Sequence, residues 1–324
     1  MLQSQLPLFL TLSYFGFIVY VLFLERRKPT TTMAWISVLF LVPFLGVILY
    51  IFFGKDMSRR KVFIVEKEEQ KKMAQISLRQ GTFLPEDTTS FRDPSVCRHL
   101  PLLHMNLKSA VAIYSEDNEV EIMIDGREKF NRLFSSLRRA REQIHIEYFI
   151  VKNDVLGNQL AKVLIQKAQE GVVVRLLLDD LGSRLSRARI REMEQAGVQV
   201  RRFFLNRLFP FPEILINHRN HRKLVVVDGK EAFLGGFNVG EEYIGLQKNR
   251  GPWRDTHLVI RGSAVLEVQN RFILDWRSSR QDYQDEDSLL FPKTRGSGDV
   301  GIQIVRSRRT TTPSCAFWIR TLAS

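Results

Sequence analysis

Two long uncharged stretches near the amino terminus limit the possible structures of this chain more than any other feature. Residues 6–24 (LPLFLTLSYFGFIVYVLFL) and residues 33–53 (MAWISVLFLVPFLGVILYIFF) contain no acidic or basic side chain. A helix needs about 20 apolar residues to cross the hydrocarbon core of a bilayer, and both stretches are long enough. The sequence therefore predicts a transmembrane hairpin over residues 1–57, and with it a multi-pass protein of the cell membrane.

Basic residues on either side of the second stretch predict the orientation. The loop before it carries Arg26, Arg27 and Lys28, whereas residues 55–72 carry seven lysines and arginines. Because cytoplasmic flanks are enriched in Lys and Arg, the larger part of the chain is expected in the cytoplasm. Residues 58–110 are predicted to be a charged juxtamembrane linker whose lysines favour an anionic leaflet. A secretory signal is the alternative for the first stretch, but MLQSQ lacks the basic residue of such a signal.

The composition narrows the class of partner and argues against two classes of site. The net charge is +13, and a positive surface attracts nucleic acid as well as anionic lipid headgroups. The apolar stretches favour lipid and argue against nucleic acid. Cys97 and Cys315 are the two cysteines, and they lie far apart in the sequence without neighbours at metal-ligand spacing. Neither a disulfide framework nor a zinc ribbon is therefore expected.

The polar part of the chain has the alternation of an α/β domain. Residues 144–151 and 172–178 are predicted to be strands, and residues 158–170 between them an amphipathic helix. Another helix is predicted over residues 127–141, where apolar side chains recur at helical spacing. We therefore expect an α/β lobe with a mixed or mostly parallel sheet over residues 111–290.

The segment HRKLVVVDGKEAFLGGFN, residues 221–238, carries the candidate chemistry. Its β-branched run, the Asp-Gly pair and the second apolar run predict a β-hairpin. Side chains two positions apart on a strand face the same way, so His221 and Lys223 are expected to project together. An imidazole can attack phosphorus and form a covalent intermediate, and a lysine ammonium can neutralise phosphoryl oxygens in the transition state. The pattern thus indicates phosphoryl chemistry.

Four further residues of this segment are candidates for the same site. Asp228 at the turn could orient an imidazole or only cap the bend. Gly235 and Gly236 allow close approach of backbone to a ligand, and the Asn238 amide can donate to a phosphate oxygen. Each residue alone has a structural alternative, because an Asp-Gly pair is usually a turn and paired glycines usually mark a bulge. Only the ordered combination makes the functional interpretation specific.

That combination is similar to the signature of the phospholipase D superfamily: His-x-Lys, four residues, Asp, six residues, Gly-Gly-x-Asn. The flanking sequences narrow the resemblance to a bacterial cardiolipin synthase and extend it over residues 10–306. They are RRKPTTTMAWISVLFLVPFLGVILYIFFG, IHIEYFI, GVVVRLLLDDLGS, NHRNHRK, WRDTHLVI and LDW.

The resemblance implies a reaction and a fold. One phosphatidylglycerol would pass its phosphatidyl group through a phosphohistidine to another, giving cardiolipin and glycerol, with neither a metal nor a nucleotide cofactor. A phospholipase D-like mixed-sheet lobe would follow the membrane hairpin, with phosphatidylglycerol and other anionic phospholipids as partners. His221 would be the nucleophile or the general acid, Lys223 the phosphate clamp and Asp228 the support of the motif's charges. The substrate-binding residues would be Asn238, Gly235 and Gly236.

One departure from the family concerns the number of motifs. Family members carry two, because displacement at phosphorus needs a nucleophile on one side and an acid for the leaving alkoxide on the other. None of the five other histidines here is followed two positions later by a lysine. The likeness fades after residues 301–307, so residues 291–324 are predicted to be the truncated start of a second lobe with an atypical tail. To be active, two copies would have to pair their motifs as a homodimer.

Other functions remain open on the sequence alone. The single motif and the basic charge also fit a dimeric phosphodiesterase or nuclease, and a membrane-bound fragment that binds lipid without turnover is a third alternative. Asp179 and Asp180 end a predicted strand and could hold a hydrated metal, but a structural role is favoured because no further acidic cluster accompanies them. A metal at His218 and His221 is disfavoured, since no cysteine lies nearby.

Overall fold

The computed structural model describes residues 12–19, 29–50, 91–180, 182–203, 221–246, 253–279, 296–305 and 318–321. These residues belong to two compact units. The described part of the smaller unit ends at residue 50, and that of the larger unit begins at residue 91.

The smaller unit consists of apolar helices. Residues 12–19 are helical, and α2 (Pro29–Leu41) and α3 (Pro43–Leu49) follow. Pro43 separates the two helices. It lacks the N–H that would continue α2, and it is the first residue of α3. The Tyr50 ring packs edge-on against Phe17 and Trp35, at 5.2 Å between ring centroids in each case.

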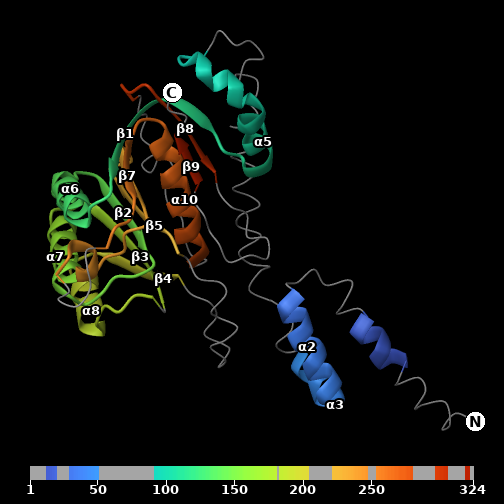
Figure 1. Cartoon of the computed structure of the whole chain (residues 1–324). Helices are drawn as coiled ribbons and strands as arrows, with labels where there is room; N and C mark the ends of the chain where they lie inside the picture. Colours follow the sequence, from blue (N-terminus) through green and yellow to red (C-terminus); the bar gives the residue numbers. More distant parts are fainter. Residues whose placement is uncertain are drawn as a thin grey trace, which may run out of the picture. The chain divides into compact units, whose positions relative to one another are not determined.

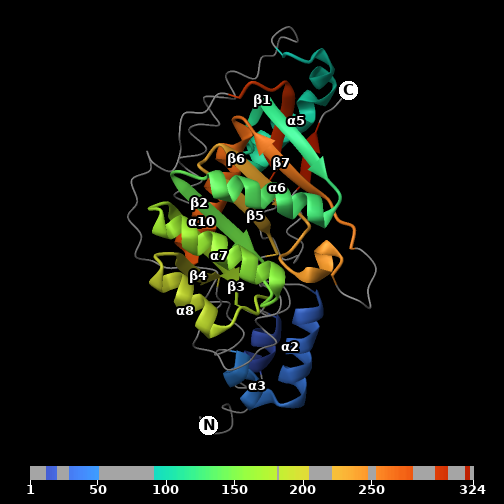
Figure 2. The same ribbon diagram turned by 90° about the vertical axis from the view of Figure 1, so that its left-hand side faces the viewer.

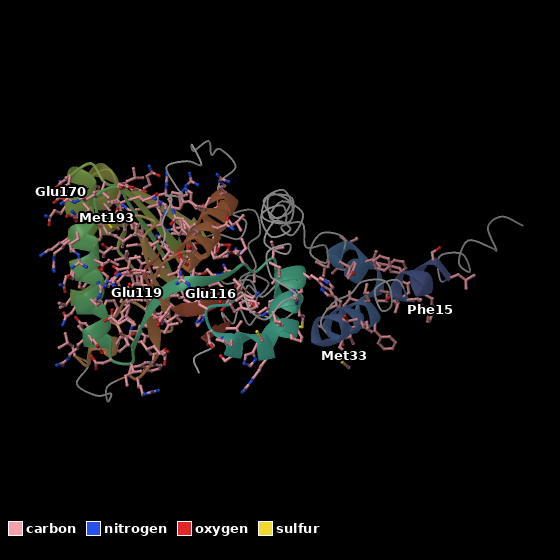
Figure 3. All side chains as sticks on the ribbon, turned by 90° about the horizontal axis from the view of Figure 1, so that it is seen from above. Phe15, Met33, Glu116, Glu119, Glu170 and Met193 are labelled. Carbon is pink, nitrogen blue, oxygen red and sulfur yellow. The ribbon has the colours of Figure 1, made fainter. Side chains whose placement is uncertain are left out.

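The outer surface of this unit is apolar too, and Figure 3 labels two of its side chains, Phe15 and Met33, both of which are exposed. Within the described residues, no helix combines the length and the apolar character that a membrane crossing needs. Both predicted stretches extend past the described residues, so the transmembrane hairpin over residues 1–57 stays a prediction. Residues 58–90 of the predicted linker also lie outside the described part.

One mixed sheet organises the larger unit. Its strand order within the described residues is β4-β3-β2-β5-β6-β7-β1-β8-β9. The pairs β2–β3 and β3–β4 are parallel and the other neighbours are antiparallel, which confirms the predicted mixed α/β sheet. The strands are β1 (Tyr114–Met123), β2 (Gln143–Tyr148), β3 (Val173–Asp179), β4 (Gln199–Phe203), β5 (Lys223–Val227), β6 (Glu231–Gly235), β7 (His257–Arg261), β8 (Val300–Val305) and β9 (Trp318–Thr321).

Helices cover both faces of the sheet. On one face lie α6 (Gly126–Arg139), α7 (Val155–Gln169) and α8 (Arg187–Gln195), and on the other lies α10 (Ala264–Ser279), as Figures 1 and 2 show from two sides. The first three begin at side-chain caps, since Asp125, Asp154 and Ser186 each accept a hydrogen bond from a backbone N–H of the first turn.

Alternation along β5 separates two cores. Val225 and Val227 belong to the core under α6 and α7, whereas Leu224 and Val226 belong to the core under α10. Lys223, two positions before Val225, therefore faces the α6 side at the start of the strand. The hairpin of β5 and β6 has the predicted form, with Val227 opposite Glu231 next to the Asp-Gly turn.

Residues from both ends of the larger unit complete the far edge of the sheet. A 3-10 helix, η4 (Pro94–His99), and α5 (Leu100–Ala110) precede β1, and the Gln303 amide on β8 donates to the carbonyl oxygens of Leu103 and Ala112 at 3.0 Å each. Strand β8 pairs with β1 and so extends the same sheet. The second lobe predicted to begin in this region stays a prediction.

Candidate active site

His221 and Lys223 lie together where β5 begins. His221 is exposed, and Lys223, the first residue of β5, is 5 % exposed. The Lys223 Nζ atom lies 3.0 Å from Nδ1 and 3.1 Å from Nε2 of His221, and it donates to the His221 carbonyl oxygen at 2.8 Å. The strand alternation thus brings the imidazole and the amine to the same face, as predicted from their spacing.

The groups around His221 and Lys223 lower the pKa values of both side chains. Partial shielding of the ring from water lowers the pKa of His221 below its ordinary value, Lys223 lowers it further, and Asp179 and Asp255 oppose both effects. Burial also lowers the pKa of Lys223 to about 8, against the opposing effect of Asp255. Near pH 7 the imidazole is therefore mostly neutral, with a free lone pair, while most of the lysine still carries its charge.

Phe149 packs against both members of the pair. Its ring centroid lies 4.7 Å from that of His221 and 5.4 Å from the Lys223 Nζ atom. A side chain on Gly182 would overlap the Phe149 ring and carbonyl, so the absence of one there makes room for the ring. Phe149 lies in the predicted strand over residues 144–151, but nothing in the sequence assigned it to the site, because its contact with His221 depends on strand pairing.

Asp255 reaches the site from the segment before β7. A Cβ on Gly236 would overlap the Asp255 carboxylate, and the Gly236 N–H donates to the Thr256 carbonyl oxygen at 2.9 Å. The paired glycines, predicted to admit a ligand, thus admit this neighbouring segment. The segment WRDTHLVI carries part of the family resemblance, but its aspartate was not predicted to belong to the site. An acidic residue just before a strand, close to the His-x-Lys motif in sequence, is the feature that could have indicated Asp255.

Asp228, predicted to be catalytic, lies at the opposite end of β5 from His221. Its carboxylate accepts hydrogen bonds from the backbone N–H groups of Arg141, Glu142 and Gln143 at 2.8–3.2 Å. Its own N–H donates to the Gln143 carbonyl oxygen at 2.8 Å, and its backbone is left-handed with φ of 52°. Asp228 therefore joins the hairpin turn to the start of β2, which fits the bend-capping alternative, and its catalytic role stays a prediction.

Asn238 is buried beside the site and already has two protein partners. Its Oδ1 accepts from the Ile150 N–H at 3.2 Å, and its Nδ2 donates to the Tyr243 hydroxyl at 2.8 Å. Tyr243 belongs to a short 3-10 helix, η6 (Glu241–Ile244), and contacts the half-exposed Trp253 edge-on. One amide N–H of Asn238 can still serve a ligand, so its predicted substrate contact stays a prediction.

A buried ionic cluster anchors the motif from the opposite face of the sheet. Arg222, between the two candidate residues, donates to the Asp275 carboxylate of α10 at 2.6 Å, and Arg271 donates to the same carboxylate. Glu147 lies 3.8 Å from Arg222. All four side chains are buried, so the opposite charges compensate each other in a medium of low polarity. This cluster fixes the backbone that carries His221 and Lys223.

The two aspartates at the end of β3 have structural partners. Asp179 accepts from the Gly182 N–H at 2.9 Å, and Asp180 pairs with Arg202 at 2.6 Å. In the part of the chain that the structure describes, no three His, Cys, Asp or Glu residues are grouped so that they could hold a metal ion. His218, weighed as a ligand, lies outside that part.

Comparisons with known proteins find similar families over two parts of the chain. The family described as "Cardiolipin synthase, PLD-like domain" matches residues 133–276, and "Phospholipase D-nuclease N-terminal" matches residues 14–55. The chain is thus similar to these two families over those residues. The predicted resemblance to bacterial cardiolipin synthases is confirmed by the relatives of this chain.

Three such relatives show how much is shared. The cardiolipin synthase of Oceanobacillus iheyensis is 44% identical over 89% of this chain and 60% of its own length. That of Listeria innocua is 40% identical over 95% of this chain and 64% of its own. The major cardiolipin synthase ClsA of Bacillus subtilis is 41% identical over 89% of this chain and 60% of its own. The chain therefore spans about three fifths of the length of the curated relatives it matches.

Proposed function

We propose that this chain is a phosphatidyltransferase that converts two molecules of phosphatidylglycerol into cardiolipin and glycerol. The observation that carries the proposal is the Lys223 amine, 3.0 Å from Nδ1 of His221, where the interior strand β5 of the mixed sheet begins. The names of the relatives give the substrate class, since cardiolipin is what a cardiolipin synthase makes.

The reaction takes two displacements at one phosphorus atom. A ring nitrogen of His221 attacks, the N–P bond forms, and the P–O bond to glycerol breaks as the leaving oxygen takes up a proton. The free hydroxyl of a second phosphatidylglycerol then attacks, its proton leaves, and the N–P bond breaks to release cardiolipin. Lys223 keeps its charge throughout and neutralises the non-bridging oxygens as charge builds on them.

The proton for the leaving glycerol requires a second acid. We place it on His221 of a second copy of this chain, because the described residues contain a single His-x-Lys motif and a two-fold axis brings identical surfaces together. The chain would thus work as a homodimer, in which one imidazole is the nucleophile and the other the acid.

We also propose that residues 1–57 anchor the lobe as a multi-pass transmembrane hairpin, with the catalytic lobe in the cytoplasm. The uncharged stretches, the basic residues that follow them and the match over residues 14–55 support this placement. This anchor would keep the site close to the lipid bilayer that contains the substrate.

The test is a turnover assay with the purified full chain in phosphatidylglycerol vesicles. The unmodified chain is expected to form cardiolipin and glycerol in equal amounts, and His221→Ala to form neither. The matched control is His145→Gln, which changes a buried histidine on the α10 side of the same sheet. If the unmodified chain forms no product while the Oceanobacillus iheyensis relative does so under the same conditions, autonomous catalysis is excluded.

The basic net charge of +13 favours one other candidate, a dimeric phosphodiesterase or nuclease. Single-stranded and double-stranded DNA added to the same assay separate the two. Cleavage of DNA, with phosphatidylglycerol left intact, would replace the lipid proposal.

A further inference from the structure

His257 is a buried histidine in the same row of the sheet as Lys223. Gly235 pairs with His257, and the register of Leu224 with Leu234 puts Lys223 opposite Gly235 on its other side. Tyr148 pairs with Lys223 in the next strand. Residues facing each other across strands share a face, so Tyr148, Lys223 and His257 all project toward α6.

The glycine in the middle of this row places no side chain between the other two. A Cβ on Gly235 would overlap the Thr256 carbonyl oxygen and come within 2.5 Å of Cα and 2.6 Å of Nδ1 of His257, so His257 lies close against the glycine. Gly235 is itself exposed, whereas Lys223 and His257 on either side are buried. The residue of this group that contacts solvent is therefore the glycine, between an amine and an imidazole.

Neither ring nitrogen of His257 has a hydrogen-bond partner among the described residues, although the side chain is 0 % exposed. A buried polar group without a partner destabilises a fold, so each one calls for a structural or functional explanation. His145, equally buried on the other face, differs in this respect, because its nitrogens lie 3.1 Å from the Gln269 oxygen and 2.9 Å from Arg175.

The charged groups that act on His257 itself are two amines, and the nearest carboxylate described above, that of Asp255, lies beside the neighbouring Gly236. Lys129 of α6 is fully buried and donates to the Tyr148 hydroxyl at 2.8 Å. Burial lowers the pKa of His257 well below its ordinary value, and Lys129 and Lys223 lower it further, so the imidazole is neutral and keeps one N–H. No carboxylate occurs in the row of paired residues across the strands, which consists of Leu178, Tyr148, Lys223, Gly235, His257 and Met123. An anion is the ligand that such a cluster would accept.

We propose that His257 forms, with Lys223, the floor of the phosphoryl subsite, and that its neutral imidazole donates a hydrogen bond to a non-bridging phosphate oxygen of the bound phosphodiester. The phosphate would sit over Gly235, within reach of His221 on the Lys223 side. His257 binds and orients the phosphorus and takes no part in bond breaking. The identity of the ligand rests on the proposed function, whereas the donor role rests on the geometry alone.

The test measures binding without turnover, using the full chain in detergent micelles. Calorimetric titrations use inorganic phosphate and, separately, a short-chain phosphatidylglycerol, the lipid with every chain also carrying His221→Ala so that none of it is turned over. His257→Phe, which keeps an aromatic ring and removes both nitrogens, is expected to weaken both affinities at least about tenfold, the usual effect of losing a hydrogen bond to a charged group. His257→Gln, which keeps a donor, is expected to retain most of the affinity. His145→Gln is the matched control and should bind both probes like the unmodified chain.

Thermal unfolding gives an independent readout. Replacing an unpartnered buried imidazole by an apolar ring should raise the Tm of His257→Phe by about 2–4 °C while binding is lost, a combination that a purely structural histidine would not give. Unchanged phosphate affinity in His257→Phe overturns the proposal, whether or not lipid binding changes. Cardiolipin formation is measured in a separate assay. If the chain forms no cardiolipin but its phosphate binding still depends on His257, the proposed function fails and the role of His257 in binding stands.

Discussion

His221 and Lys223 perform their proposed roles in opposite protonation states. The imidazole needs its lone pair and the lysine needs its proton, and shielding from water lowers both pKa values. Lowering the first below the ordinary value of 6.5 frees the nucleophile at neutral pH, while lowering the second to about 8 leaves the lysine mostly charged. The useful pH range lies between the two values.

A bell-shaped pH profile of kcat/KM is therefore expected. The rate rises as the nucleophilic His221 loses its proton, at its lowered pKa below 6.5. It falls at higher pH as the acid His221 of the second copy and then, at about pH 8, Lys223 lose theirs. Lys223→Arg should remove the part of the fall near pH 8, since a guanidinium keeps its proton at these pH values. Asp255→Asn should shift both limbs to lower pH, because Asp255 raises both pKa values. A falling limb unchanged in Lys223→Arg would rule out Lys223 as its origin.

The spacing of two residues was enough to predict that His221 and Lys223 face the same way, because it depends only on the geometry of a strand. The sequence could not reveal Phe149 and Asp255, since each comes to the site through strand pairing or a loop. For Asp228 the sequence left two roles open, orienting an imidazole or capping the bend. Asp228 is close to His221 in sequence, but a five-residue strand separates them in space.

Two connections between elements hold the motif strand in place. At one end, Asp228 links the hairpin turn to the start of β2 through backbone N–H groups. At the other, Arg222 is held by Asp275 of α10. The hairpin itself was predictable from Asp-Gly, whereas the partner of each connection lies at least 50 residues away and had no sequence signal.

Asp228→Ala is expected to lower the free energy of unfolding by about 1–3 kcal/mol, because it removes the acceptor of several backbone N–H groups. The kcat of the folded protein should change less than about twofold, since Asp228 does not contact the reacting groups. Urea unfolding and turnover on the same samples measure both effects. Glu142→Gln, in the same corner but exposed, is the control. Loss of turnover with unchanged stability would return Asp228 to the catalytic groups.

Asp275→Ala is expected to lower the free energy of unfolding by about 3–5 kcal/mol, because it leaves Arg222 and Arg271 charged and buried without their carboxylate. Asp180→Ala breaks a partly exposed pair with Arg202 and should cost less than about 1 kcal/mol. Denaturant unfolding of both variants makes the comparison. Equal effects would mean that the buried cluster does not anchor the motif strand.

The number of His-x-Lys motifs determines how many copies of the chain the proposed reaction needs. A chain with a single His-x-Lys motif, spanning about three fifths of its relatives, needs a second imidazole if it follows the proposed double displacement. In a dimer of two copies related by a two-fold axis, His221 of each copy would be the second imidazole for the other.

Mixing experiments separate paired from independent chains. Unmodified chain and His221→Ala are combined in equal amounts in detergent, allowed to exchange and then reconstituted. If both imidazoles of a dimer are needed, the activity should fall to about a quarter of that of the same total amount of unmodified chain. Independent chains would retain about half, and that value would contradict the dimer.

In the proposed reaction, His221 itself carries the phosphatidyl group. With the chain in excess over phosphatidylglycerol labelled at phosphorus, a rapid quench in base followed by peptide mass spectrometry should find the phosphatidyl adduct on His221, released when more phosphatidylglycerol is added as acceptor. Turnover of the lipid without any adduct on His221, or an adduct that persists in His221→Ala, would contradict the account.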